Sequence, residues 1–189
     1  AGYLLTSHGG TFLHAGEEFA RSKSGNENSY NAGDIVNKLD WTRTSTYSDL
    51  VSYYHGMIDI RKSFSGFRNI YTESGETVEE NTETGFFNKV NGNNLTEIKD
   101  FTSVIGGKDA EGHIQSTVNS IGYYLSNDKA GEWNQVAVLM NNTLEDKKVT
   151  LSAADGSNQW VLVSDGLKAS VKGVSTTTDN SITVPRKSL

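Results

Sequence analysis

The sequence lacks cysteine, any dense basic cluster and any long apolar run, and each absence excludes a class of protein. Without cysteine the chain can form neither a disulfide nor a thiolate metal site. The net charge is −6, and no basic cluster is denser than Lys147-Lys148 or Arg186-Lys187, which argues against nucleic-acid and anionic-membrane partners. The longest apolar runs, such as VAVLM at 136–140, have only the length of a strand, so we expect no membrane insertion.

Signals for metal or phosphate binding are also missing. No two of the four histidines are three or four residues apart, which argues against a metal site. The Gly-Gly pairs at 9–10 and 106–107 lack the residues that follow in a phosphate-binding loop. The sequence therefore implies no required cofactor. It leaves calcium open, because the scattered Asp and Asn residues do not have the spacing of a calcium-binding loop.

What is present is an ordinary folded composition in 189 residues, with 35% apolar and 21% charged residues. The chain starts without Met in the apolar stretch AGYLLTS, which reads as the end of a helix. It stops in SITVPRKSL, which reads as an unfinished strand. We therefore expect the chain to be a piece of a longer protein.

Up to residue 68 the pattern is α/β. Residues 11–19 are a short, largely apolar run of the kind that a buried parallel strand shows. A long polar loop follows, and then a helix within residues 46–64. In that helix apolar residues recur at the spacing of one helical face, and Thr46 with Asp49 predicts its cap. Strand, loop and helix in this order form the repeating unit of an α/β barrel or a doubly wound sheet.

After residue 68 the pattern is all-β. Turn-rich segments separate five expected strands at residues 121–125, 136–141, 148–152, 159–163 and 181–184. Their spacing predicts a small antiparallel sandwich. Residues 72–120 are polar and rich in Gly, Asn, Thr and Glu, so we expect a mobile insertion or irregular strands there.

The polar loop GNENSYNAGDIVNKLDW at 25–41 permits two interpretations. Its amide, carboxylate and aromatic side chains are those that bind and stack on sugars, and such loops carry ligands in α/β barrels. Alternatively, its Asn and Gly residues serve only turns. Glu17 and Glu18 are adjacent and should point to opposite faces, so we expect one of them to support a neighbouring site. They give no glycosidase carboxylate pair. Trp133 and Trp160 could stack on sugars, but packing in the core is the preferred interpretation.

A resemblance decides between these alternatives. The stretch GGTFLHAGEEFARSKSGNENSYNAGDIVNKLDW resembles the end of the catalytic barrel in type I pullulanases, debranching members of glycoside hydrolase family 13 in the α-amylase superfamily. The tyrosine-rich helix that ends in MIDIRKSFSGFR and the later VAVLMNNT also match that family in order. The match is dense over residues 1–68 and looser from about residue 121. Thr11 replaces the usual proline before the strand, and the stretch at 72–120 is longer than in the family.

The resemblance implies a fold and a set of site residues. Residues 1–68 would contain the eighth strand of a (β/α)8 barrel at 12–18, the substrate loop, and the eighth helix at 46–63. Residues 69–189 would form a C-terminal β-sandwich. Asp34 stands where the family places a carboxylate that contacts α-glucan, and Lys38 stands where some members place an arginine that does so. Tyr30, Asn31 and Arg21 belong to the same motif and would shape that end of the cleft.

The resemblance also implies what the chain does not contain. The family's nucleophile, acid/base and transition-state-stabilising carboxylates lie on earlier barrel strands, so no catalytic residue is expected here. The complete enzyme would cleave α-1,6 linkages in pullulan and branched glucans with retention. The expected partners are α-glucan and the remainder of the barrel, in the same protein or as a separate chain. The alternative is a non-catalytic carbohydrate-binding or structural β-module. We expect export in a Gram-positive bacterium, with a cytoplasmic location as the alternative.

Overall fold

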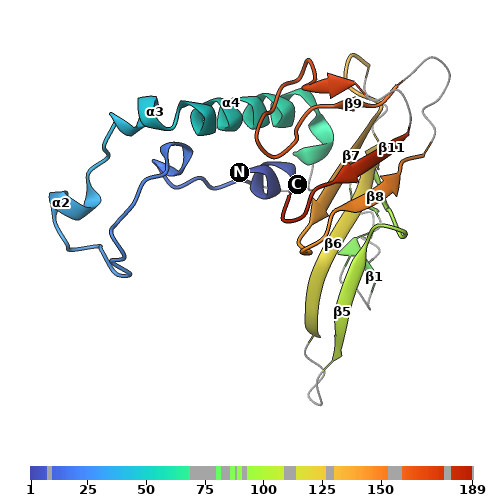
Figure 1. Ribbon diagram of the computed structural model, residues 1–189, viewed down its shortest axis with the longest axis horizontal. Helices are drawn as coiled ribbons and strands as arrows, with labels where there is room; N and C mark the ends of the chain where they lie inside the picture. The colour runs from blue at the N-terminus through green and yellow to red at the C-terminus, as the bar shows by residue number, and fades with distance from the viewer. Residues whose placement is uncertain are drawn as a thin grey trace.

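A five-stranded antiparallel sheet lies at the centre of the structure. The computed structural model describes residues 1–7, 10–68, 80–81, 86–87, 89–90, 93–108, 114–126, 130–152, 159–176 and 180–188. The strands of the sheet are β3 (Lys89–Val90), β4 (Asn93–Glu97), β5 (Ser103–Lys108), β6 (Ile114–Ser126) and β7 (Gln135–Asn141). One edge of β6 pairs with β5 and then β4, and its other edge pairs with β7 (Figure 1).

The period of two along β6 and β7 gives the sheet two apolar faces. Successive side chains of a strand point to opposite sides. Tyr123 and Val138 therefore pack into one core cluster, whereas Tyr124 and Ala137 pack into another. A strand that is buried on both faces must be covered by a layer on each side, and the chain supplies a helical layer and a β layer.

The helical layer consists of α1 (Gly2–Thr6), α4 (Ser48–Ser63) and the short 3₁₀ helix η2 (Ser65–Phe67). Met57, Ile60 and Phe64 of this layer share a core cluster with Tyr123 of the sheet. The Tyr123 hydroxyl donates to the carbonyl of Thr6 at 3.2 Å, which joins α1 to the sheet. The first 68 residues and the β strands are thus joined by a continuous core.

The β layer on the opposite face is a ribbon of β8 (Lys147–Thr150) and β11 (Ser181–Val184), which pair antiparallel. Its side chains Val149 and Val184 are buried together with Ile98 and Phe101, which lie between β4 and β5. Two further two-stranded ribbons are β9 (Val161–Leu162) with β10 (Ser175–Thr176), and β1 (Glu80–Asn81) with β2 (Phe86–Phe87). Among the described residues, no helix has the length and apolarity needed to cross a membrane.

The structure confirms most of the expected elements. Each of the five strands predicted after residue 68 overlaps an observed strand, and all pairing is antiparallel. Helix α4 lies where a helix over 46–63 was predicted. Strands β4, β5 and the first half of β6 also fall inside residues 72–120, so the described part of that stretch contributes regular strands to the central sheet. The rest of that stretch lies outside the described residues.

The strand predicted over residues 12–18 does not form. Residues 10–14 are irregular, and residues Glu17–Phe19 form the 3₁₀ helix η1. Phe12 is 83% exposed, so the apolar run is not buried. A parallel barrel strand needs neighbours on both edges, and the described residues supply none.

The predicted cap of the long helix is also wrong. Thr46 is the last residue of a separate short helix, α3 (Arg43–Thr46). Tyr47 occupies the N-cap position of α4, and its side chain makes no capping hydrogen bond. The side chains that pack best are Tyr53, Tyr54, Met57 and Ile60, and Tyr47 is outside the core. The sheet under the helix therefore decides which of its faces is buried.

Candidate functional site

The motif-rich part of the sequence forms a loop that extends away from the sheets. This projecting loop, residues 20–42, runs from η1 to α3 and carries the short helix α2 (Asp34–Asn37) at its far end (Figure 1). The Arg43 guanidinium donates to the carbonyls of Phe19 and Ala20, which holds the two ends of the loop together. The rings of Phe19, which is fully buried, and Trp41 lie 5.3 Å apart at the same place.

Arg21 lies half-buried at the start of the loop and is engaged by the loop itself. Its Nη1 donates to the carbonyl of Ala15 at 3.2 Å and lies 3.3 Å from Nε2 of His14. Its Nη2 donates to the carbonyl of Asn37, at the end of α2. The Arg21 side chain also packs on Gly16, where an added Cβ would lie 2.7 Å from the Cβ of Arg21. A glycine with φ of +99° is required at this turn.

Three further polar side chains connect the two sides of the loop. The Lys23 ammonium donates to the Ser29 hydroxyl at 2.6 Å, and the Asn37 amide donates to the Ser29 carbonyl at 2.6 Å. Ser29 is buried although it lies in a polar loop. The Asn26 carboxamide accepts from the backbone of Asn28, which is the turn role that asparagine commonly has. Lys23, Ser29 and Asn37 were not predicted as site residues, since no periodic pattern marks them.

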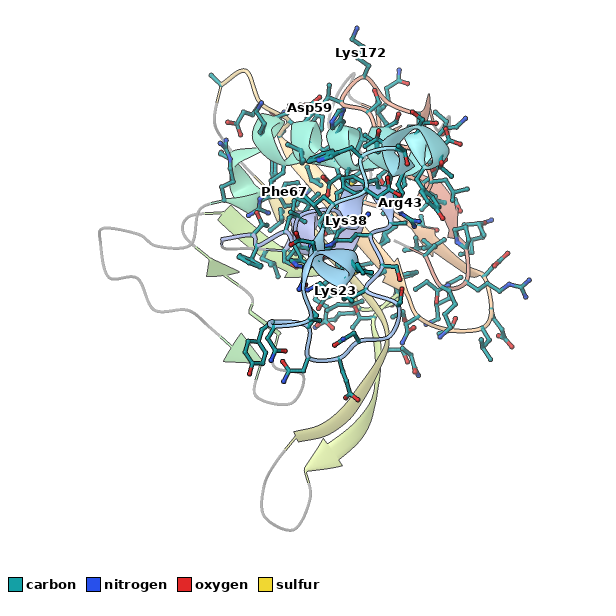
Figure 2. All side chains as sticks on the ribbon, turned by 90° about the vertical axis from the view of Figure 1, so that its left-hand side faces the viewer. Lys23, Lys38, Arg43, Asp59, Phe67 and Lys172 are labelled. Atoms are coloured by element: carbon teal, nitrogen blue, oxygen red, sulfur yellow. The ribbon has the colours of Figure 1, made fainter. Side chains whose placement is uncertain are left out.

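The residues predicted to contact glucan point outward. Tyr30 is 82% exposed, and Asn31, Asp34 and Lys38 are also exposed. Within the described part of the chain, the Asp34 carboxylate and the Lys38 ammonium make no hydrogen bond or ion pair with another side chain. Figure 2, which looks at this end of the molecule, shows Lys23 and Lys38 on the loop. The structure therefore brings four of the five predicted residues to the exposed side of one loop, and turns Arg21 inward.

The loop also holds a carboxylate that stays ionised. The side chain and the backbone of Thr42 donate to Oδ1 of Asp40, at 2.6 and 3.1 Å. These hydrogen bonds hold the pKa of Asp40 below its usual value, and the bond from the Thr42 side chain has the largest effect.

Exposed carboxylates, amides and aromatic rings on one ordered loop can bind hydroxyl groups and stack on an apolar ring face. That is the chemistry of sugar recognition.

The other residues singled out in the sequence have structural roles. The Glu18 carboxylate accepts from the backbone of Gly16 at 3.0 Å, so it supports the turn on which Arg21 packs, whereas Glu17 is exposed. Trp133 stacks on Phe64 with 6.4 Å between ring centroids, and Trp160 stacks on Tyr124 at 6.0 Å. The preference for core packing of both tryptophans is confirmed.

A large cavity lies outside the loop, and no loop residue lines it. It has a volume of about 1190 Å³ and lies between α4, β7, β9 and β11, with Met57, Trp133, Trp160 and Val163 in its lining. None of the predicted site residues lines it. Among the described residues, no three His, Asp or Glu side chains come together as a metal site would require. His8 and His113 lie outside those residues.

Comparison with known proteins identifies a class. No protein-family model matches the chain. A curated pullulanase from Bacillus subtilis (strain 168) is 43% identical over 68 residues, which are 36% of this chain and 10% of that protein. The chain therefore resembles a segment of a pullulanase, as its sequence motifs predicted.

Solved structures agree with this class. A pullulanase from Bacillus acidopullulyticus has a TM-score of 0.63 at 26% identity, covering 98% of this chain and 18% of that protein. A pullulanase from Anoxybacillus sp. LM18-11, complexed with maltotetraose, has a TM-score of 0.59 at 25% identity, covering 97% of this chain and 21% of that one. The chain thus spans about a tenth of the curated relative and about a fifth of the solved structures.

Proposed function

We propose that this chain is the part of a debranching glycoside hydrolase that contains the end of the catalytic barrel and the C-terminal β domain. The complete protein cleaves α-1,6 linkages in pullulan and branched α-glucans with retention, and its catalytic carboxylates lie outside this chain. The observation that carries the proposal is the exposed loop with Tyr30, Asn31, Asp34 and Lys38, in a chain that resembles pullulanases along nearly its whole length.

Exposed apolar side chains support docking to further polypeptide. Phe12, Ile35 and Trp41 are between 64% and 90% exposed, and all lie in residues 10–42. A cluster of large apolar side chains on one region marks an interaction surface. The partner that fits is the remainder of the barrel, because residues 12–18 then gain the neighbouring strands that a parallel strand needs.

A complementation experiment separates this proposal from a non-catalytic β-module. The chain is mixed with the remaining part of its parent protein, and release of reducing ends from pullulan is measured. Restored activity is expected, with none from either part alone. If the chain alone binds maltotetraose and the mixture stays inactive, the carbohydrate-binding module is the better description.

The role of Asp34 is tested by Asp34→Ala in the complete protein. A carboxylate that accepts hydrogen bonds from sugar hydroxyls contributes about 1.5–3 kcal/mol, so maltotetraose affinity should fall about 10- to 150-fold. Asp49→Ala, at an exposed acidic residue in the first turn of α4, is the matched control and should leave the affinity unchanged. If Asp34→Ala lowers the unfolding temperature without weakening affinity, the carboxylate has a structural role only.

A further inference from the structure

We propose that Arg21 is a positioning residue that orders the projecting loop and thereby presents its glucan-contacting side chains, without touching the glucan itself. The inference rests on the proposed function of the loop, and it assigns Arg21 a different task from Asp34 and Lys38. We call the set Arg21, Lys23, Ser29 and Asn37 the loop clamp.

The hydrogen bonds of Arg21 are directed at the chain's own backbone. Arg21 directs its guanidinium at two backbone carbonyls, of Ala15 and Asn37, which are 22 residues apart in the sequence. A planar guanidinium suits such a bridge, because its donors have a fixed fork geometry that an ammonium group lacks. Both Nη groups donate within the chain, and the Nε, which has no partner among the described residues, is buried and therefore not accessible to a sugar hydroxyl.

Arg21 also stabilises the C-terminal end of α2. This helix has only one turn, and a helix this short is not stable by itself. Its last carbonyl, that of Asn37, accepts from Arg21, which satisfies a group that the helix leaves unpaired. Asp34 and Lys38 stand at the two ends of this turn. The Lys38 N–H donates to the Asp34 carbonyl at 2.9 Å, which sets the separation of the two residues, and the Arg21 hydrogen bond holds this turn against the start of the loop.

The four residues of the loop clamp form a continuous network of hydrogen bonds. Arg21 holds Asn37, the Asn37 amide holds the Ser29 carbonyl, and the Lys23 ammonium holds the Ser29 hydroxyl. Ser29 is buried, and the residue that follows it in the sequence, Tyr30, is exposed. The buried and half-buried residues of the loop clamp thus lie close in sequence to exposed residues of the same motif. By holding the backbone of the loop, the clamp determines where the exposed side chains point.

The physical consequence is preorganisation. A loop that is already ordered loses less conformational freedom when it binds a ligand than a loop that must order on binding. Loss of Arg21 should therefore weaken glucan binding through disorder of the loop. The rate of the chemical step at a saturating glucan concentration should change little.

The experiment compares Arg21→Ala with Arg68→Ala, which removes an exposed arginine that has no side-chain hydrogen bond in the described part of the chain. Backbone amide exchange is measured first, on the 189-residue chain without any glucan. The amides of Ala32, Asn37 and Lys38, which are hydrogen-bonded within the loop, should exchange about tenfold faster or more in Arg21→Ala. A residue that acts only by contacting glucan would leave this exchange unchanged.

The second measurement uses the complete protein with maltotetraose and pullulan. For Arg21→Ala we expect a KM raised about ten- to a hundredfold, as for one or two lost charged hydrogen bonds, with kcat within about threefold. Millimolar methylguanidinium should restore part of the affinity. The substitution Arg21→Lys should not restore the affinity, because lysine keeps the positive charge but lacks the forked donor geometry of a guanidinium.

The outcomes are distinguishable from failure of the proposed function. Unchanged exchange in Arg21→Ala overturns the clamp. If Asp34→Ala weakens maltotetraose binding and Arg21→Ala does not, the clamp is again wrong, but the proposed function stands. If neither variant weakens binding, the proposed function is wrong. Faster exchange, a raised KM and rescue by methylguanidinium together support the clamp.

Discussion

Gly56→Ala in helix α4 is a sharp test of how the helix packs on the β domain. Helix propensity alone predicts that this change stabilises the protein by about 1 kcal/mol, since Ala is the best helix former and Gly one of the worst. The tertiary structure predicts the opposite. An added Cβ would lie 2.0 Å from the carbonyl oxygen and 2.9 Å from the Cβ of Ala169, in the segment between β9 and β10.

The magnitude follows from how far the two segments must separate. An ordinary van der Waals contact is at least 3.4 Å, so helix and segment must move apart by about 1.4 Å, the difference from 2.0 Å. The obstructing atom belongs to the backbone, and hydrogen bonds from Ser170 to Val163 and from Asp165 to Lys168 hold that segment. Overpacking costs about 1–3 kcal/mol, and a backbone obstacle places this case near about 2–3 kcal/mol. Subtracting the gain of about 1 kcal/mol from helix propensity leaves a net destabilisation of about 1–2 kcal/mol.

The assay is thermal and urea unfolding of the chain, with Ser52→Ala as the control. Ser52 is an exposed residue one turn earlier in α4, and its replacement should stabilise slightly. A loss of 1–2 kcal/mol corresponds to a fall of about 2–8 °C in the unfolding temperature for a chain of this size. If Gly56→Ala raises the unfolding temperature as Ser52→Ala does, the close contact between α4 and Ala169 does not exist.

Three further predictions concern other contacts of the same core. Tyr123→Phe removes the hydroxyl bound to the Thr6 carbonyl, and should lower the free energy of unfolding by about 1 kcal/mol in urea titrations; no change would mean that α1 does not dock there. The Glu132 carboxylate accepts from the backbone N–H of the buried Ser65 at 2.6 Å and from its hydroxyl at 2.8 Å. Glu132→Ala should therefore lower the free energy of unfolding by about 1–3 kcal/mol, and Glu132→Gln should lower it less. The backbone N–H groups of Lys168 and Leu167 donate to Asp165 and hold the pKa of its carboxyl below the usual value, with that of Lys168 contributing most. This interaction stabilises the fold above the unfolded pKa of about 3.9, and the stabilisation is lost as the pH falls through the folded pKa. Unfolding midpoints from pH 6 to 2 should therefore fall less steeply in Asp165→Asn; equal slopes would refute the linkage.

The packing of α4 joins the two halves of the sequence, although their patterns indicate two separate fold types. By pattern, residues 1–68 are α/β and the rest is all-β. In the structure, Leu5, Met57 and Phe64 share one core with Leu125 of the sheet. Helices α1 and α4 of the α/β part thus pack as a layer of the β domain. The projecting loop extends away from that domain (Figure 1).

The local pattern of the sequence determined several features of this protein. The alternation of apolar residues fixed the strands around Tyr123 and Val138, because a period of two needs no knowledge of the partner. The helix around Met57 followed from its apolar spacing, and the resemblance to pullulanases followed from a run of motifs.

Only the tertiary structure decided the rest, because those features depend on partners that are distant in the sequence. The apolar run at 12–18 is not a strand in this chain, since a strand needs neighbours that the described residues lack. The contact of Gly56 with Ala169 depends on how two remote segments pack. In the projecting loop, sequence spacing could not separate Arg21 from Asp34. One binds carbonyls of its own loop and the other faces outward, and that difference arises from the loop's three-dimensional path.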